Sequence, residues 1–303
     1  MVSGGCRAIS ALIFHCEFHG GEWFPWPLNE WERGTELARL RVGTRPSLAA
    51  RFPCVRIITY NVHSCVGTDG RLDPARIAEV IASTEADVAC LQELDFGRAR
   101  SGLVHQTEVI AAALAMQFHF HPAIRAASEE YGDAILSKHS LRVIRCGELP
   151  SPLGFEKRGA LWVEIDDGEA RWQVLNTHFG LGRTERRTQA RALAEWATEA
   201  LARPPTVLCG DLNSRPGSAV HRLLASGLRE VQRSLRRSHH RTFATRWPWI
   251  CLDYIYVSSD VEVVRAEVLR TPLARVASDH FPLVADLRSA ANGTQAPRMQ
   301  GSG

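Results

Sequence analysis

The sequence has 303 residues, of which 45% are hydrophobic and 23% charged, as is typical of a globular protein with a substantial core. Its formal net charge of +3 excludes a polycation of the histone kind and leaves any preference for anions to local patches. The eight cysteines form no CxxC pair, so neither a disulfide scaffold nor a zinc site is expected.

Hydrophobic runs are short throughout the chain. None approaches the roughly 18 residues that a transmembrane helix requires. The apolar patch at residues 8–14 is too short and too poorly flanked for a clear signal peptide. Together with the expected reduced state of the cysteines, these features favour a cytoplasmic location.

Residues 1–53 differ in composition from the rest of the chain. They combine Trp23, Trp26 and Trp31 with an arginine-rich segment, and they carry no catalytic motif. Residues 36–42 are a candidate short helix. We predict an N-terminal extension of unknown role, either packed on the domain or partly disordered.

The remainder of the chain alternates between strand and helix patterns. The first helix is expected to start at Asp73, which can cap it, and Pro74, which suits the first turn. Apolar runs and periodicities predict strands at 55–62, 86–93, 134–137, 141–149, 159–166, 172–179, 206–212, 252–258, 261–269 and 282–287, and helices at 73–83, 107–115, 184–202 and from about 217.

The order of these elements indicates the fold class. Strands and helices alternate early and strands dominate late, which favours a two-sheet α/β sandwich over a doubly wound sheet. The strands between 141 and 179 are expected to be antiparallel, with a hairpin turn near 168–170. We predict one domain over residues 54–288, followed by a flexible C-terminal tail over 289–303.

Polar side chains stand where the predicted strands end. Side chains at the ends of adjacent strands can converge on one mouth of a sheet sandwich. Capping accounts poorly for so many carboxylates, carboxamides and imidazoles at such positions. The set comprises Asn61, Glu93, His178, Asp211, Asn213, Asp253, Asp279 and His280.

Motifs around these residues resemble those of the endonuclease/exonuclease/phosphatase superfamily. The segments are, in order, TYNVH, LQELD, YGDAILS, NTHFG, GDLNSRPGS, LDYIYVS and SDHFPLVADL. The resemblance covers roughly residues 54–288 and is strongest to an uncharacterised bacterial branch. It implies a DNase I-like four-layer sandwich, with two mixed β-sheets flanked by helices.

The resemblance also implies a role for each motif residue. Asn61, Glu93 and Asp279 would form a site for Mg²⁺, with Mn²⁺ as an alternative, because hard cations prefer oxygen ligands. Asp211 would orient or deprotonate the attacking water. His178 and Asn213 would hold the phosphate, and Asp253 would fix the ring of His280. Further candidates are Tyr131 and Arg183 for substrate binding, and Asp133 for either the site or a structural hydrogen bond.

These roles predict a divalent-metal-dependent hydrolase of phosphate esters, of the phosphodiesterase or nuclease kind. The alternatives are a phosphomonoesterase, a sphingomyelinase-like phosphodiesterase of lipid headgroups and a non-catalytic binding module. The expected partner is a phosphate-ester substrate carried by nucleic acid, lipid or a small molecule. We expect a monomer without an obligate protein partner.

Two basic segments and a tryptophan pair allow two interpretations each. The segments at 182–191 and 229–241 could contact substrate phosphates or form solvated surfaces. Trp247 and Trp249 could form an aromatic rim or pack between loops.

Overall fold

The computed structural model describes residues 16–19, 22–25, 54–234 and 240–290. The chain divides into two compact units, Met1–Ala49 and Ala50–Gly303. In the first unit, β1 (Cys16–His19) pairs antiparallel with β2 (Glu22–Pro25). The candidate helix at 36–42 lies outside the described residues, as does most of the predicted C-terminal tail.

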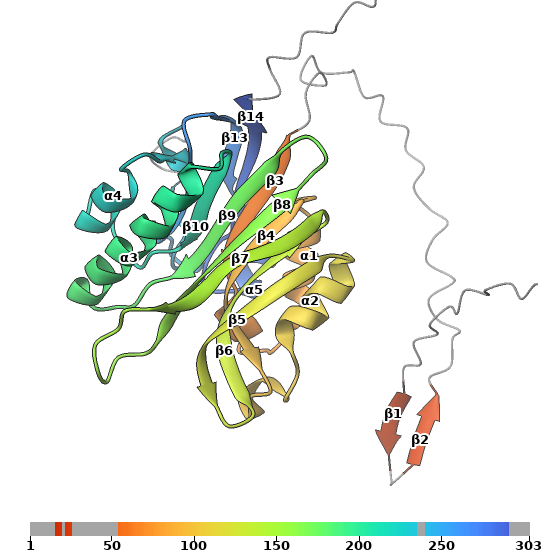
Figure 1. The fold of residues 1–303 in the computed structure, drawn as a ribbon. Helices are drawn as coiled ribbons and strands as arrows, with labels where there is room; N and C mark the ends of the chain where they lie inside the picture. The colour runs from red at the N-terminus through yellow and green to blue at the C-terminus, as the bar shows by residue number, and fades with distance from the viewer. Residues whose placement is uncertain (1–15, 20–21, 26–53, 235–239, 291–303) are drawn as a thin grey trace, which may run out of the picture. The chain divides into compact units, whose positions relative to one another are not determined.

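The second unit contains all the predicted site residues. Figure 1 shows its helices and strands. Its helices and strands are β3 (Val55–Asn61), α1 (Pro74–Ala82), β4 (Val88–Phe96), α2 (Gln106–Leu114), β5 (Gln117–Ala126), β6 (Glu129–Ser137), β7 (Ser140–Leu149), β8 (Arg158–Asp166), β9 (Arg171–His178), α3 (Arg183–Leu201), β10 (Thr206–Asp211), α4 (Ala219–Leu224), β11 (Arg229–Glu230), β12 (Asp253–Val257), β13 (Val261–Val268), α5 (Pro272–Ala277) and β14 (Leu283–Ser289).

The strands form two six-stranded mixed sheets. The first has the order β13-β14-β3-β4-β6-β5 and the second the order β11-β12-β10-β9-β8-β7. Each sheet contains one parallel pair, β3 with β4 and β9 with β10, and its other pairs are antiparallel. This arrangement confirms the predicted mixed sheets.

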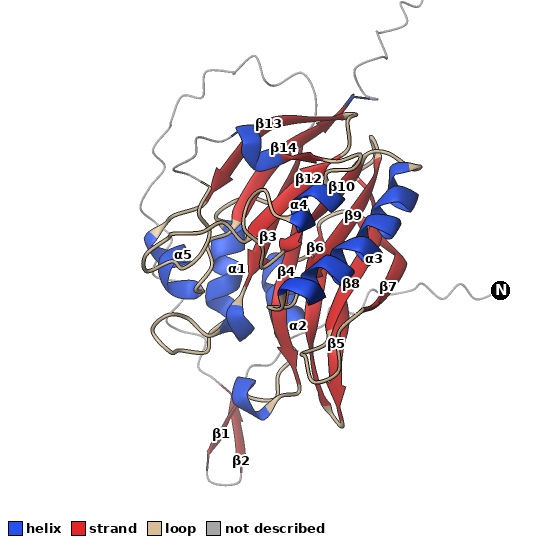
Figure 2. Ribbon diagram, turned by 90° about the vertical axis from the view of Figure 1, so that its left-hand side faces the viewer, coloured by secondary structure: helices blue, strands red, loops and turns tan. Residues whose placement is uncertain are grey.

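Alternating side chains divide the interior into three apolar layers. Ile57 of β3 packs between the two sheets, whereas its neighbour Ile58 faces α1, α2 and α5. In the second sheet, Val207 packs between the sheets and Leu208 faces α3 and α4. Successive strand residues point to opposite faces, so each strand contributes to two layers. Figure 2 shows α3 and α4 side by side over the second sheet, which completes the predicted four-layer sandwich.

Most of the predicted elements are confirmed, with small shifts at their ends. Asp73 caps α1 by accepting a hydrogen bond of 3.0 Å from the backbone N–H of Arg76. The hairpin near 168–170 is present between β8 and β9. Strand β5 was not predicted, because it is an edge strand whose exposed and polar residues lack an apolar run. None of the described helices combines the length and apolar character needed to span a bilayer.

Candidate active site

A cleft of about 710 Å³ lies where loops from both sheets meet. Most of the predicted site residues line it, namely Glu93, Tyr131, His178, Asp211, Asn213, Asp279 and His280. Asn61 and Asp253 are buried and contact these lining residues. Arg183 does not line this cleft but a neighbouring cavity.

Glu93 lies within a strand, and the prediction that it closes one was wrong. β4 continues to Phe96, and its pairing with β6 shifts register between Leu91 and Leu94. Glu93 has a φ of 63°, in the left-handed region that side chains rarely adopt. Such a bulge re-aims a side chain without ending the strand. It directs the Glu93 carboxylate into the cleft.

Strand pairing in the second sheet brings three of the polar side chains together. Asp211 of β10 is in register with His178 of the parallel strand β9 and with Asp253 of the antiparallel strand β12. At Gly210, a Cβ atom would lie 1.9 Å from the carbonyl oxygen of Thr177. Glycine is therefore required for β9 and β10 to approach this closely just before Asp211.

Asn61 holds the carboxylates of Glu93 and Asp211 next to each other. Its Nδ2 donates to Glu93 Oε1 at 2.8 Å and to Asp211 Oδ2 at 3.0 Å. Its Oδ1 accepts from the backbone N–H of His63 at 3.1 Å, which fixes the orientation of the carboxamide. In this arrangement the carboxamide of Asn61 bridges the carboxylates of Glu93 and Asp211 and orients both.

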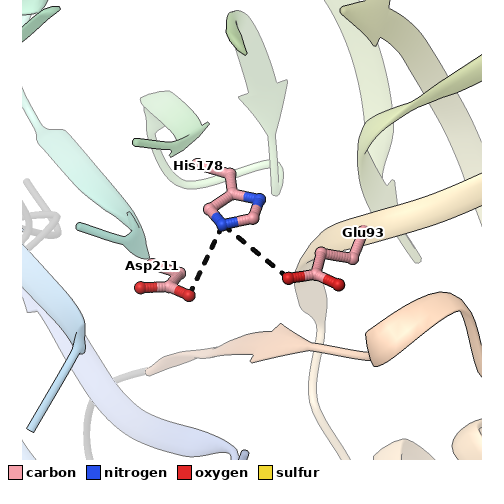
Figure 3. A group of neighbouring side chains, drawn as sticks. All are labelled: Glu93, His178 and Asp211. Carbon is pink, nitrogen blue, oxygen red and sulfur yellow. Dashed lines mark ion pairs between the residues drawn. The ribbon is translucent and has the colours of Figure 1, made fainter. Parts of the chain in front are cut away.

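His178 lies between these carboxylates (Figure 3). Its Nε2 is 3.6 Å from Asp211 Oδ2 and 3.8 Å from Glu93 Oε1. Arg158 Nη1 lies 3.3 Å from its Nδ1 and Asn213 Nδ2 lies 3.1 Å from its Nε2, so a doubly protonated ring would face two donors. Burial, reinforced by Arg158 and His280, holds the pKa of His178 well below its usual range.

Both ring nitrogens of His178 face hydrogen-bond donors. Arg158 Nη1 faces Nδ1 and Asn213 Nδ2 faces Nε2, so the unprotonated nitrogen of the neutral ring accepts from one of these two groups. The Nε2 side of the ring faces the carboxylates of Asp211 and Glu93.

His280 has the opposite protonation state. Its Nδ1 donates to Asp253 Oδ2 at 2.9 Å, which leaves Nε2 facing Asp211 Oδ2 at 3.7 Å. Burial lowers the pKa of His280, but the carboxylates of Asp253 and Asp211 outweigh it and raise the pKa to about 10. The ring is an imidazolium at neutral pH. Burial also raises the pKa of Asp211 above its ordinary value.

Asn213 is held by its backbone and by two contacts. Its φ of 46° is left-handed, a conformation that asparagine tolerates better than most residues. Its backbone N–H donates to Asp211 Oδ1 at 2.8 Å, and its Nδ2 donates to the carbonyl of Phe179 at 2.8 Å. The carboxamide is thereby fixed beside the ring of His178.

Buried polar residues beneath the cleft join the two sheets. Gln92 of β4 donates to Asn176 Oδ1 of β9 at 2.7 Å, and Asn176 donates to the carbonyls of Leu91 and Ala134 at 2.9 Å. Asp133 is buried next to the backbone amide of Glu93. A network that spans the sheets fixes the relative positions of the site residues that each sheet carries.

Sequence reasoning missed three arginines that line one wall of the cleft. Asp95 is fully buried and accepts two hydrogen bonds of 2.8 Å from Arg100 and one of 3.4 Å from Arg98. Both guanidinium groups lie over the ring of Tyr131, at 5.5 and 5.7 Å. Arg158 pairs with Glu156 Oε1 at 2.6 Å. The RAR segment at 98–100, which follows a strand, was the sequence signal that could have located part of this wall.

The donor set fits a hard divalent cation. The ligand atoms of Glu93, His178 and Asp211 lie within 4.8 Å of one another, as do those of Asp211, Asp253 and His280. The carboxylate oxygens of Glu93 and Asp211 belong to the first group, and oxygen ligands suit Mg²⁺ or Mn²⁺. Among the described residues, Asp279 belongs to neither group; its Oδ1 lies 3.9 Å from His63 Nδ1.

Comparisons with known proteins agree with this geometry. A model described as the Endonuclease/Exonuclease/phosphatase family matches residues 58–280. No curated protein matches the sequence.

Solved structures share the fold at low sequence identity. An endonuclease/exonuclease/phosphatase from Beutenbergia cavernae is 24% identical with a TM-score of 0.64, over 78% of this chain and 72% of that one. The human Nocturnin catalytic domain with bound sulfate is 20% identical with a TM-score of 0.62, over 78% and 95% of the two chains. A mannosyl-6-phosphatase from Bacteroides thetaiotaomicron is 19% identical with a TM-score of 0.59, over 77% and 99%.

Proposed function

We propose that this chain, which belongs to the endonuclease/exonuclease/phosphatase family, is a divalent-metal-dependent phosphodiesterase that hydrolyses its substrate by in-line attack of water. The observation that carries the proposal is one cleft in which Asn61 holds two carboxylates beside a neutral and a protonated imidazole. A phosphodiester resists attack because the nucleophile must approach a negatively charged group.

The chain supplies donors and a base around the scissile phosphate. Asp211, whose pKa is raised, accepts a proton from the attacking water. The imidazole of His178 and the carboxamide of Asn213 hold phosphate oxygens. His280 offers a positive charge and an Nε2–H that protonates the leaving oxygen as its bond to phosphorus breaks. Asp253 holds the His280 ring in the required orientation.

Glu93 and Asp211 would hold the metal ion through their carboxylate oxygens, with Asn61 fixing both carboxylates. A bound divalent cation supplies Lewis-acid stabilisation of charge on the phosphate oxygens. Asn61 and the bulge at Glu93 keep the carboxylates together before any ligand arrives, which lowers the reorganisation that binding requires.

A panel of substrates tests this proposal. Hydrolysis would be measured with Mg²⁺ on bis- and mono-(p-nitrophenyl) phosphate, oligonucleotides and phospholipids, with EDTA and the His280→Ala variant as controls. We expect hydrolysis of the diester that EDTA abolishes. Diester hydrolysis that persists in EDTA, or at wild-type rate in His280→Ala, would contradict the proposal.

The three arginines that line one wall of the cleft favour a phosphomonoesterase as the second candidate function. Arg98, Arg100 and Arg158 line the cleft, and guanidinium groups suit the dianion of a terminal phosphate. Their pairing with Asp95 and Glu156 offsets part of this charge, which is why the diesterase is preferred. Hydrolysis of monoesters alone in the same panel would reverse that preference.

A further inference from the structure

A second cavity, of about 490 Å³, adjoins the cleft and is lined by five arginines. They come from segments separated in the sequence, namely Arg183, Arg186 and Arg187 of α3, Arg215 of the loop after β10, and Arg222 of α4. Asn213 lines both the cleft and this cavity, so the two share a wall. We call the second cavity the arginine groove.

The described lining of the arginine groove contains no Asp or Glu. Of the acids close by, Glu185 and Asp211 interact electrostatically with Arg186. Within the described part of the chain, none of the five guanidinium groups forms an ion pair with a carboxylate. By contrast, the arginines of the cleft wall each pair with one. The groove is therefore a site of concentrated positive potential next to the catalytic residues.

The stability of α3 does not explain Arg183 and Arg187. A helix carries partial positive charge at its N-terminus, so cations in the first turns are unfavourable and acids are favourable. Glu185 is a favourable acid in the first turn and accepts from the backbone N–H of Gly182, while Arg186 donates to the carbonyls of Gly180 and Leu181. Arg183 and Arg187 are unfavourable cations in the same turns, and an anionic ligand in the groove would account for them.

Exposed tryptophans extend the groove. Arg215 and Ile250 line both the arginine groove and a third cavity, which also contains Trp249. Trp249 is 57% exposed, and the guanidinium group of Arg215 lies 5.8 Å from the centre of its ring. Trp247 is 79% exposed. An unpaired base can stack on such a ring, whereas a base within a duplex already has both faces covered.

We propose that the arginine groove binds single-stranded nucleic acid, whose phosphates contact the arginines and whose bases stack on Trp249. This names the substrate class of the proposed phosphodiesterase, and it rests on that function for its link to catalysis. The scissile phosphate would lie in the cleft, and the strand would continue past Asn213 into the groove. The apolar face of α3, including Leu193 and Trp196, is buried against the second sheet, so this helix has no apolar face to insert into a membrane.

Binding can be tested separately from hydrolysis. Fluorescence anisotropy of a labelled twelve-nucleotide oligothymidylate would be measured in EDTA from 50 to 300 mM salt. The variant Arg187→Gln/Arg222→Gln removes two groove charges. Arg142→Gln/Arg265→Gln is the matched control, because it removes the same charge from exposed positions on β7 and β13.

Each lost phosphate contact lowers the slope of log affinity against log salt by about 0.7 for a single strand. The groove variant should therefore lose about 1.4 from the slope and bind about 25-fold more weakly at 100 mM salt. Trp249→Ala should weaken binding by about ten-fold and leave the slope unchanged, because stacking releases no counterion. Oligouridylate should behave like oligothymidylate.

Equal affinities of the groove and control variants would overturn the proposal, as would binding of phosphatidylserine vesicles without binding of oligonucleotide. Turnover of bis(p-nitrophenyl) phosphate by the wild type is measured in parallel with Mg²⁺. If the oligonucleotide binds in the groove and the small diester is not hydrolysed, the proposed function fails while the groove assignment stands. If the diester is hydrolysed and the groove variant binds normally, only the groove assignment fails.

Discussion

Replacing Asp133 by asparagine should stabilise the metal-free protein, and the gain should grow with pH. Asp133 is fully buried, and burial is the main cause that raises its pKa from 3.8 to about 8. Arg158 and the backbone amide of Glu93 oppose this rise, while the carboxylates of Glu93 and Asp211 add to it. Asparagine has the shape of the protonated acid and carries no charge to bury.

The sign and size of this stability change follow from the linkage between protonation and folding. The folded pKa lies above the unfolded one, so the wild-type protein loses stability as pH rises from about 4 to about 8 and no further above that. At pH 7 the difference between the pH and the ordinary pKa of 3.8 lowers the free energy of unfolding by on the order of 4 kcal/mol, at about 1.36 kcal/mol for each pH unit. For a domain of this size, Asp133→Asn should raise Tm by on the order of 10 °C.

Urea unfolding between pH 5 and 8 in EDTA measures this difference, with fluorescence of the buried Trp162 and Trp172 as the probe. The control is Asp69→Asn, since Arg76 lowers the pKa of exposed Asp69 to about 2. The favourable contribution of Asp69 is complete above about pH 4 and is lost toward pH 2, so this variant should be slightly less stable by an amount constant from pH 5 to 8. A gain for Asp133→Asn that does not change with pH would refute the reasoning.

Three further predictions concern catalysis and metal binding. His280→Ala should lower kcat on the diester by about 10²–10⁴-fold with an unchanged circular dichroism spectrum, because the imidazolium is lost; wild-type kcat would exclude the assignment. Asp253→Asn should shift the alkaline limb of the pH–rate profile to lower pH, because the carboxylate that raises the pKa of His280 is removed; an unshifted limb would show that another group sets it. Glu93→Gln should weaken Mg²⁺ binding by at least about ten-fold in calorimetry, with Glu79→Gln on the exposed face of α1 as the control; equal affinities would remove Glu93 from the metal site.

Local patterns were sufficient for most of the elements and for most of the residues that meet in the cleft. Apolar runs located the strands, and Asp73 with Pro74 located the start of α1. Adjacent residues such as Ile57 and Ile58 point to opposite faces of their strand. A strand that is apolar on both faces is therefore expected to be covered on both sides. The family motifs placed the polar residues at strand ends, and Asn61, His178 and Asp211 do stand there.

Other features depend on register and on contacts between distant segments. The bulge at Glu93 arises from the pairing of β4 with β6, and the orientation of Asn61 arises from contacts with residues 32 and 150 positions away. Arg98, Arg100 and Arg158 give no periodic signal, because they serve the cleft and not the core.

The sequence by itself determined the fold class and the motif residues of the site, because apolar periodicity and short motifs are local properties of the chain. The tertiary structure decided which nitrogen of His178 faces the carboxylates, that Asn61 presents donors to Glu93 and Asp211, and that arginines of α3, α4 and the loop after β10 line one groove. These features arise from long-range packing, which sets distances and burial that no local pattern encodes.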